Sequence, residues 1–426
     1  MKMTEPFPRM IELRQNFPAS PKLEFPSLLR NQFEAGGILA RLAPGMRIAV
    51  GVGSRGITSL TETVKAVIGI LKDAGTEPFI VPVMGSHGGA TPEGQRRILA
   101  EFGITQETMG VSIEASMEVL QIGEMFDGRE VVFSLPAYQA DGIVFINRIK
   151  PHTDFHGNLG SGLQKMLTIG FGKHLGAANA HRAASILGHE AVIRETARVI
   201  LGATKVLCGV AIIEDQYHQT ADIRVVRAED ILKEEDGLFI KARSLMAGLP
   251  FDQIDLLIVD EMGKQFSGTG MDTNVIGRGV LGYSASLKPD NRIKPQIFRI
   301  FLRDLSVASN GNGVGIGLAD FTTSRAVKAL NLQYTYINTI TGLGLPVAKI
   351  PIYFDTDREV LKNAFASLVY DSPAALRVVH IANTLNLDRM LVSESLIEEA
   401  NGRAGLNPVG TAKEMEFDGN GNLLPI

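Results

Sequence analysis

Short apolar runs alternate with amphipathic stretches from Arg47 onward, and this alternation constrains the fold more than any other feature of the sequence. RIAVGVG (47–53) and PFIVPV (78–83) are continuous apolar runs, and glycine-rich turns follow them. Continuous apolar strands are typical of parallel sheets whose two faces are both covered by helices. The pattern therefore predicts an α/β fold with mainly parallel sheets flanked by helices.

The stretches between the apolar runs carry helix signals. The second of them begins with Thr91-Pro92-Glu93, in which threonine suits the N-cap and proline the first helical position. Amphipathic or helix-like patterns cover 60–74, 91–102, 188–200, 322–330 and 357–368. Strand-like runs lie closer together between 111 and 135, which indicates an antiparallel insertion.

A chain of 426 residues is long enough for two domains. The polar stretch 214–236 and the turn AGLP (247–250) precede a second series of strand and helix patterns. We therefore predict an N-terminal domain over 1–247 and a C-terminal α/β domain over 248–426, with the active site in the cleft between them. Six prolines in the first 44 residues predict a wrapping segment without a long element.

Composition excludes several classes of function. The 42 basic and 46 acidic residues give a net charge of −4, which disfavours a nucleic-acid surface. Cys208 is the single cysteine, so neither an internal disulfide nor a cysteine-rich metal site is possible. No apolar stretch approaches the roughly 18 residues of a membrane span. We expect a cytoplasmic protein with a small-molecule substrate and with no nucleic-acid or membrane partner.

Glycine is the one over-represented residue type. It accounts for 45 of the 426 residues, about a tenth of the chain, whereas its typical share is about 7%. Much of the excess lies in strand-end turns, where ligands of open parallel sheets bind. The turns in the first half cover 51–56, 84–94, 148–165 and 170–181, and five of the eight histidines fall in them: His87, His152, His156, His174 and His181. These turns are therefore the predicted site.

His87, in the turn SHGG, is a candidate acid–base residue, because an imidazole exchanges protons near neutral pH and the following glycines let a substrate approach. The structural alternative is a loop histidine that caps the next helix.

His181 is a candidate metal ligand or a helix cap. Arg55 suits a carboxylate or phosphate, or it pairs with Glu62.

The turn GNLGSGLQK (157–165) leads into an amphipathic stretch. Backbone N–H groups at such a turn favour an anion, so Gly160 and Ser161 are candidate contacts for a phosphate or carboxylate. The turn lacks the Gly-Lys-Ser/Thr ending of a P-loop, which argues against an NTPase. Lys165 is a phosphate ligand, a covalent anchor or a surface lysine.

Five motifs in order resemble those of the lactate racemase family over about residues 45–185: SRG (54–56), GSHGG (85–89), KPH (150–152), GSGLQKMLTIG (160–170) and NAH (179–181). The resemblance implies a nickel pincer nucleotide, a pyridinium-3,5-bisthiocarboxylic acid mononucleotide that carries most of the metal's ligands. It implies that Lys165 attaches this cofactor, that His181 binds nickel, and that Arg55, Gly160 and Ser161 lie at the cofactor. The N-terminal domain would then hold the cofactor and the catalytic residues.

The same resemblance implies a racemase or epimerase that inverts the hydroxyl-bearing C2 of a 2-hydroxy acid. His87 and His152 match its acid–base pair on opposite sides of the substrate, and Arg55 matches its substrate-side arginine. A histidine takes the hydroxyl proton while C2 gives a hydride to the cofactor, and the planar 2-keto acid accepts the hydride back on either face.

The sequence also departs from the family pattern. Val52 stands where the family usually has an acid, and the longer loop after His152 makes His156 a competitor for the second acid–base role. In the C-terminal domain the matching loop reads DEMGKQFSGTGMDTN (260–274), where Lys264 is the residue that matches. Hydrogen-bonding side chains there suggest a hydroxy acid larger than lactate, such as a sugar acid: Ser267, Thr269, Asp272 and Asn274. The alternative is a loop that packs under the domain interface.

Two other functions fit the same residues. One is a lyase or hydrolase whose metal is bound directly by histidines. The other is a non-catalytic homologue that binds an anionic metabolite or the cofactor without turnover. Val52 and the altered loop of the C-terminal domain keep this alternative open. The sequence does not specify the oligomeric state.

Overall fold

The chain divides into two compact units. The computed structural model describes residues 7–54, 56–153, 157–279, 295–341, 344–370 and 372–426. The first unit is Ala19–Met246, and the second unit joins Ala247–Ile426 to the beginning of the chain up to Pro18. The sequence predicts that this beginning belongs to the N-terminal domain. Its strand instead pairs with strands from the far end of the chain, a long-range pairing that no local pattern predicts.

A mainly parallel sheet forms the centre of the first unit. Among the described residues it has five strands in the order β3-β2-β6-β7-β8, of which β8 alone is antiparallel to its neighbour. The strands are β2 (Arg47–Val52), β3 (Glu77–Pro82), β6 (Gly142–Arg148), β7 (Val206–Glu214) and β8 (Thr220–Arg227). The predicted α/β class is confirmed.

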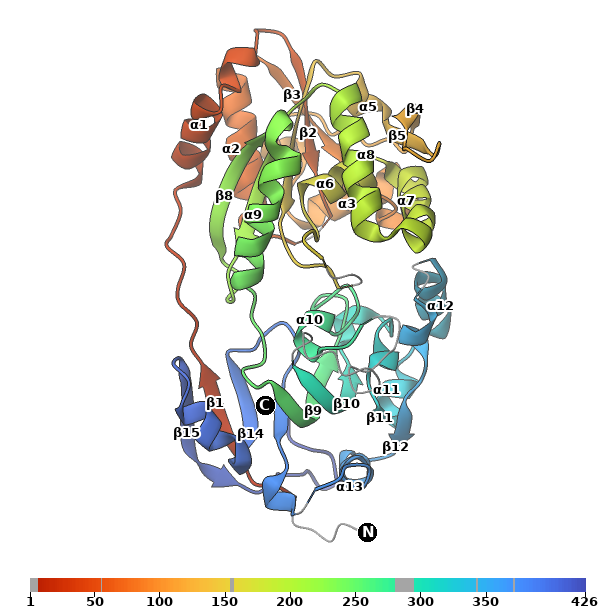
Figure 1. Ribbon diagram of the computed structural model, residues 1–426. Helices are drawn as coiled ribbons and strands as arrows, with labels where there is room; N and C mark the ends of the chain where they lie inside the picture. Colours follow the sequence, from red (N-terminus) through yellow and green to blue (C-terminus); the bar gives the residue numbers. More distant parts are fainter. Residues whose placement is uncertain (1–6, 55, 154–156, 280–294, 342–343, 371) are drawn as a thin grey trace. The chain divides into compact units, whose positions relative to one another are not determined.

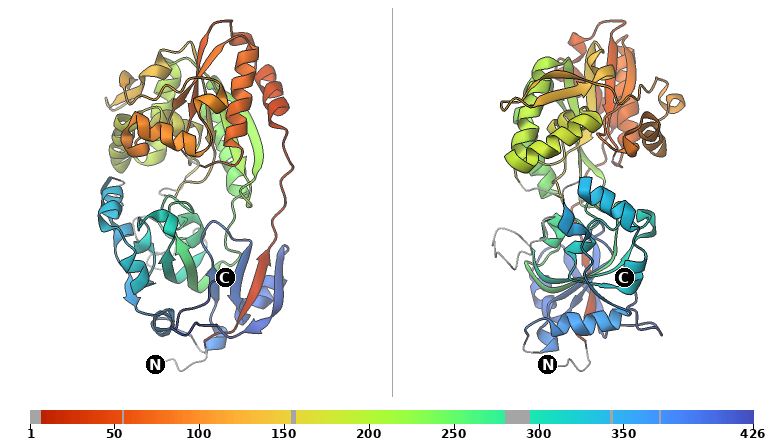
Figure 2. Two further views of the ribbon diagram at one scale, coloured as in Figure 1. Left: turned by 180° about the vertical axis from the view of Figure 1, so that it is seen from behind. Right: turned by 90° about the vertical axis from the view of Figure 1, so that its right-hand side faces the viewer.

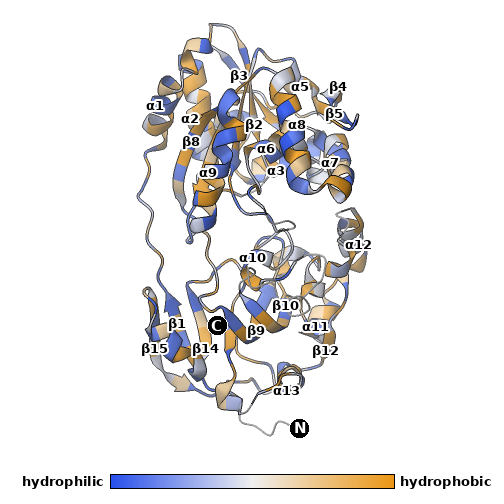
Figure 3. Cartoon of the chain, viewed as in Figure 1, coloured by the Kyte–Doolittle hydropathy of each residue, from blue (hydrophilic) through white to orange (hydrophobic). Residues whose placement is uncertain are grey.

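Helices cover both faces of this sheet, because successive strand residues point to opposite sides. Ala49 and Phe145 enter a core with α7, α8 and α9, whereas Val50 and Ile146 enter a core with α1 and α2. Figures 1 and 2 show the two helix layers, and Figure 3 shows both hydrophilic and hydrophobic residues along α2 and α8. These helices are α1 (Phe25–Ala35), α2 (Leu60–Asp73), α7 (Lys173–Leu187), α8 (His189–Ala203) and α9 (Ile231–Ser244).

Several local predictions for the first unit are confirmed. α3 (Pro92–Glu101) follows Thr91, whose Oγ1 accepts the N–H of Gly94 at 3.1 Å. The expected antiparallel insertion contains the hairpin of β4 (Val119–Glu124) and β5 (Glu130–Ser134). One local prediction is wrong: the proline-rich beginning does hold a longer element, the 11-residue helix α1. Pro26 is compatible with it because this proline lies in the first turn, where no backbone N–H is required. Shorter helices are α4 (Gln106–Met109), α5 (Leu135–Tyr138) and α6 (Leu163–Lys165).

The second unit contains a mixed sheet. Among the described residues its eight strands run in the order β12-β11-β10-β9-β13-β14-β1-β15, parallel from β12 to β13 and antiparallel beyond. The strands are β1 (Met10–Gln15), β9 (Gln253–Met262), β10 (Gln296–Leu305), β11 (Phe321–Thr323), β12 (Ile352–Phe354), β13 (Val378–Ile381), β14 (Arg389–Ser393) and β15 (Leu406–Lys413).

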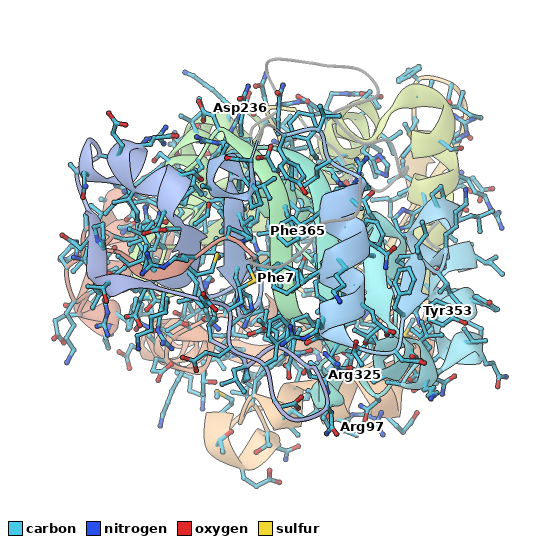
Figure 4. All side chains as sticks on the ribbon, turned by 90° about the horizontal axis from the view of Figure 1, so that it is seen from below. Phe7, Arg97, Asp236, Arg325, Tyr353 and Phe365 are labelled. Atoms are coloured by element: carbon cyan, nitrogen blue, oxygen red, sulfur yellow. The ribbon has the colours of Figure 1, made fainter. Side chains whose placement is uncertain are left out.

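Residues from both ends of the sequence build the core of the second unit. β1 pairs with β14 and β15. The ring centroids of Phe7 and Phe365, the latter on α13, are 5.9 Å apart. Figure 4 labels both side chains. The helices are α10 (Thr273–Ile276), α11 (Ser324–Lys328), α12 (Leu332–Thr341), α13 (Asp357–Ala366) and α14 (Ile397–Asn401). No helix within the described ranges is long and apolar enough to cross a membrane.

A buried group of charged side chains links the strands of the second unit. Arg303 on β10 bonds to Asp260 on β9 and, through Nε at 2.8 Å, to Asp357 on α13. Arg325 also reaches Asp357 at 2.7 Å, and His380 Nε2 lies 2.5 Å from Asp260. Burial raises the pKa of Asp260, but His380 and Arg303 outweigh it and hold that pKa below its ordinary value. The charges therefore compensate one another inside the unit.

Candidate functional site

Three of the predicted site segments follow adjacent strands of the first unit. Ser54 comes after β2, His87 after β3 and His152 after β6, and β2 lies between β3 and β6 in the sheet. Because the three strands are parallel, their carboxyl ends meet at one edge. This edge is the candidate site.

The turn after β3 presents His87 beside the turn after β2. His87 is exposed, and its Nδ1 is hydrogen-bonded to Ser54 Oγ. Gly88 has φ +69°, and a Cβ there would lie 2.5 Å from the carbonyl carbon of Gly94, so this turn requires glycine. The N-cap of the next α-helix, α3, is Thr91. His87 therefore does not cap this helix, which was its alternative role.

His152 and Lys165 are in contact after β6. His152 Nε2 and Lys165 Nζ are hydrogen-bonded, and both side chains are half-buried. The loop between them is closed by a bridge, in which Lys150 N–H donates to Ser161 O at 2.9 Å and Ser161 N–H to Lys150 O at 2.8 Å. Gly160 is buried against this bridge, where a Cβ would lie 2.3 Å from Lys150 O. The lysine is therefore held at the site rather than directed into solvent.

A carboxylate from α9 lies at the start of the segment that carries Lys165. Glu235 is 1% exposed, and its Oε2 accepts the N–H of Gln164 at 2.9 Å. A Cβ on Gly162 would lie 1.8 Å from Glu235 Oε1, so the close approach of the carboxylate requires glycine there. The sequence analysis expected the N–H groups of this turn to bind an external anion. In the structure, the chain's own Glu235 takes that role at Gln164.

Burial raises the pKa of Glu235 to about 7. Hydrogen bonds from Gln164 and Leu163 and the charge of Arg194 lower this pKa, but by less than burial raises it.

Asn147 fixes the turn at Gly162 from β6, since its Nδ2 donates to Gly162 O at 2.7 Å. The residues after Lys165, Met166–Gly170, form a π-helical turn, a distortion that is frequent at functional sites.

His181 lies on α7, half-buried, with its ring centroid 6.4 Å from that of His189. Ala177, one turn earlier on α7, has its Cβ 3.6 Å from the position that a Cβ on Gly85 would take. Residues four apart share a helix face, so His181 lies on the face of α7 that meets the loop after β3. Within the described ranges no three His, Cys, Asp or Glu side chains form a group that could hold a metal ion.

Lys173 is a buried lysine that the sequence analysis did not single out. It is fully buried at the start of α7 with φ +54°, and its Nζ donates to the carbonyl of Pro82 at the end of β3. Burial lowers the pKa of Lys173 to about 8. Its ammonium group anchors α7 to the same sheet edge.

The candidate substrate residues of the second unit make hydrogen bonds within their own segment. Lys264 Nζ donates to Gly268 O at 2.5 Å, and Thr269 Oγ1 donates to Met271 O at 2.7 Å. Ser267 Oγ lies 3.2 Å from Thr269 Oγ1, and Asp272 Oδ1 accepts the N–H of Asn274 at 3.0 Å. Ser267, Thr269 and Asp272 are buried. The structure thus brings these side chains together as the framework of one loop.

Two predicted residues, Arg55 and His156, lie outside the described residues. Val52 is the last residue of β2 and is fully buried in the core with α1 and α2. The position at which the family pattern has an acid therefore belongs to the hydrophobic core, and Ser54 is the residue that contacts His87.

Sequence reasoning gave no role to Ser54, Asn147 or Glu235. Asn147 has a signal in hindsight, because it is a polar residue in the otherwise apolar run GIVFIN. Glu235 has none, because it lies in the charged run KEED (233–236), a pattern typical of a solvated helix face.

No protein-family model matches this chain, and no curated protein matches it. The solved structures that are similar to this chain include the following two. A lactate racemase apoprotein from Thermoanaerobacterium thermosaccharolyticum has 13% identity and a TM-score of 0.48, over 84% of this chain and 91% of the other. A structural-genomics protein from Thermotoga maritima has 14% identity and a TM-score of 0.45, over 68% of this chain and 72% of the other. These values do not establish a family for this chain.

Proposed function

We propose that this protein is a racemase or epimerase that inverts the hydroxyl-bearing C2 of a 2-hydroxy acid with a nickel pincer nucleotide attached through Lys165. The contact between Lys165 Nζ and His152 Nε2 carries the proposal, because it joins an attachment residue to an acid–base residue. Both lie at the sheet edge where His87 meets Ser54.

The donor groups fit this cofactor. Lys165 has a primary amine that can form a thioamide with a thiocarboxyl group, and His181 has an imidazole nitrogen, a ligand type suited to nickel. Both side chains are half-buried, so neither is enclosed in the core. When bound, the cofactor would supply the hydride acceptor for C2.

The histidines of the chain move the proton. In one half of the reaction the hydroxyl proton passes to a histidine while C2 loses a hydride, which leaves a planar 2-keto acid. In the other half the hydride returns to C2 on the opposite face and a proton returns to the oxygen, which inverts the configuration at C2. His87 and His152 serve one enantiomer each. In the tautomer whose Nδ1–H donates to Ser54 Oγ, the proton-accepting atom of His87 is Nε2.

The loop of the second unit does not favour a large substrate over a small one. The hydroxyl of Thr269 and the carboxylate of Asp272 already bind backbone groups of their own loop. The proposal therefore names the class, a 2-hydroxy acid whose carboxylate Arg55 would hold, without a preferred size.

Intact-mass and metal analysis tests the proposal. Protein produced together with the enzymes of cofactor synthesis should contain stoichiometric nickel and carry a covalent adduct on Lys165. Lys165→Ala should lose the adduct, whereas Lys205→Ala, a control on an exposed lysine, should keep it. His87→Ala and His152→Ala should each abolish C2 inversion while nickel stays bound. If loaded protein inverts none of a broad panel of 2-hydroxy acids, the proposed reaction is wrong.

A second candidate is a metalloenzyme with directly bound metal, for which the neighbouring rings of His181 and His189 offer two ligands, fewer than the three or four of a tight site. Such an enzyme should bind zinc or manganese without the nucleotide, and Lys165→Ala should not affect it. A non-catalytic binder should instead gain thermal stability with ligand and show no turnover.

A further inference from the structure

Glu235 is an unusual residue for its position. The side chain is 1% exposed, and its Oε1 is buried with no hydrogen-bond partner among the described residues. A buried carboxyl oxygen without a partner costs free energy, and an apolar residue at this position of α9 would avoid that cost. The carboxyl group therefore needs a reason that core packing does not supply.

The contacts of Glu235 point to the segment that carries Lys165. Its Oε2 accepts the N–H of Gln164, the residue immediately before Lys165. Its Oε1 lies so close to Gly162 that a Cβ there would be 1.8 Å away. A carboxylate at the start of a helical segment satisfies an N–H group that the segment itself leaves without an acceptor. α6 packs against both α8 and α9, so the cap comes from a separate element with fixed geometry.

We propose that Glu235 is a positioning residue: by capping Gln164 from α9, it fixes the turn that carries Lys165 and so maintains the contact of Lys165 with His152. Its effect on catalysis rests on the function proposed above. Its effect on the placement of Lys165 is a property of the chain without cofactor, and it can be measured separately.

Amine acylation of the cofactor-free protein measures this placement. The probe is an N-hydroxysuccinimide ester of acetate, and peptide mass spectrometry gives the rate at each lysine. In the protein without substitutions, Lys165 should react slower by about fivefold or more than exposed Lys65 on α2, because the Lys165 amine is half-buried and is held by His152. Glu235→Ala should raise the Lys165 rate to within about twofold of Lys65.

The controls separate positioning from general destabilisation. Glu235→Gln keeps a side-chain oxygen acceptor and should leave the Lys165 rate slow, whereas Glu235→Asp withdraws the carboxylate and should raise it. Glu234→Gln changes an exposed neighbour on the same helix and should have no effect. Buried Lys173 reports unfolding of the unit, so it should stay unreactive throughout. If Glu235→Ala unfolds the unit, Glu235→Asp decides the question.

An unchanged Lys165 rate in folded Glu235→Ala or Glu235→Asp overturns the inference. In protein produced with the cofactor-synthesis enzymes, Glu235→Ala should lower the Lys165 adduct by about tenfold, and Glu235→Gln should largely restore it. If the unmodified sequence acquires no adduct, the proposed function fails, while the acylation rates still decide the role of Glu235.

Discussion

Nδ1 of His87 and Oγ of Ser54 form a hydrogen bond across the ends of the adjacent parallel strands β3 and β2. We expect this bond to fix the tautomer of His87 that exposes Nε2 as the proton acceptor. Ser54→Ala should lower the rate of C2 inversion by about fivefold, the equivalent of one hydrogen bond of roughly 1 kcal/mol. Inversion kinetics and histidine NMR of the cofactor-free protein would measure the two effects.

Ser59→Ala is the matched control, because Ser59 also lies between β2 and α2 and its side chain makes no capping hydrogen bond to α2. An unchanged ring signal of His87 in Ser54→Ala would contradict the role of Ser54.

Two glycine substitutions near Glu235, one in close contact with its carboxyl group and one in open space, should have opposite effects on the free energy of unfolding. Gly162→Ala should lower the free energy of unfolding by about 1–3 kcal/mol, because the new Cβ forces the carboxyl group aside. Gly237→Ala, on the same helix as Glu235, meets no atom within 4 Å and should raise it by about 0.5–1 kcal/mol. Urea unfolding measures both.

The Gly162→Ala change should cost less in a Glu235→Ala background, where the obstructing oxygen is absent. Strictly additive effects would show that the clash is with another group.

Lys173 predicts a pH dependence of stability. Its pKa of about 8 in the folded chain lies below the ordinary lysine value, so between about pH 8 and pH 10.4 the unfolded chain binds more protons. The free energy of unfolding should therefore rise with pH across this window. Below the window Lys173 is charged in both states, and burial of its ammonium group should lower the free energy of unfolding. At about 1.4 kcal/mol per pKa unit, Lys173→Met should remove a rise of ~3 kcal/mol.

The measurement is the free energy of unfolding at several pH values. Lys205→Met is the control, because Lys205 also donates to a carbonyl, Ala140 O at 3.2 Å, but is exposed. The prediction fails if both variants show the same pH profile as the unmodified sequence.

The buried charges of the second unit predict a large loss of stability when one cation is removed. Arg303→Met leaves Asp260 and Asp357 without their shared partner, although both are buried, and should cost about 3–5 kcal/mol in unfolding experiments. Arg299→Met, on the same strand, removes side-chain bonds to Ser367 at the surface and should change stability by less than about 1 kcal/mol.

The parts of the fold that the sequence predicts are those governed by local patterns. The apolar runs of β2 and β3 and the Thr91-Pro92 start of α3 are specified within a few residues, and the structure places them as expected. The partner of β1 is not specified locally, since its register joins Met10 to Ser393 and Lys413. Such long-range pairing depends on the tertiary structure of the complete second unit.

The candidate site shows the same division. The strand-end turns predict that residues after β2, β3 and β6 gather at one edge, because parallel strands end together. Whether an N–H group in the glycine-rich turn awaits a ligand or already has a partner depends on α9, which follows in sequence only after β7 and β8. The loop around Ser267 is similar, because hydroxyl groups that could bind a substrate are indistinguishable in sequence from those that close a turn.

The position of β1 imposes an order on biosynthesis. This strand is synthesised before any residue of the first unit, but its partners β14 and β15 are translated only after the whole of that unit. The first unit is contiguous and can fold as it emerges from the ribosome, whereas the sheet of the second unit cannot be completed until β14 and β15 have been translated. During that interval the buried side chains of β1, such as Leu13, remain exposed to chaperones and to aggregation.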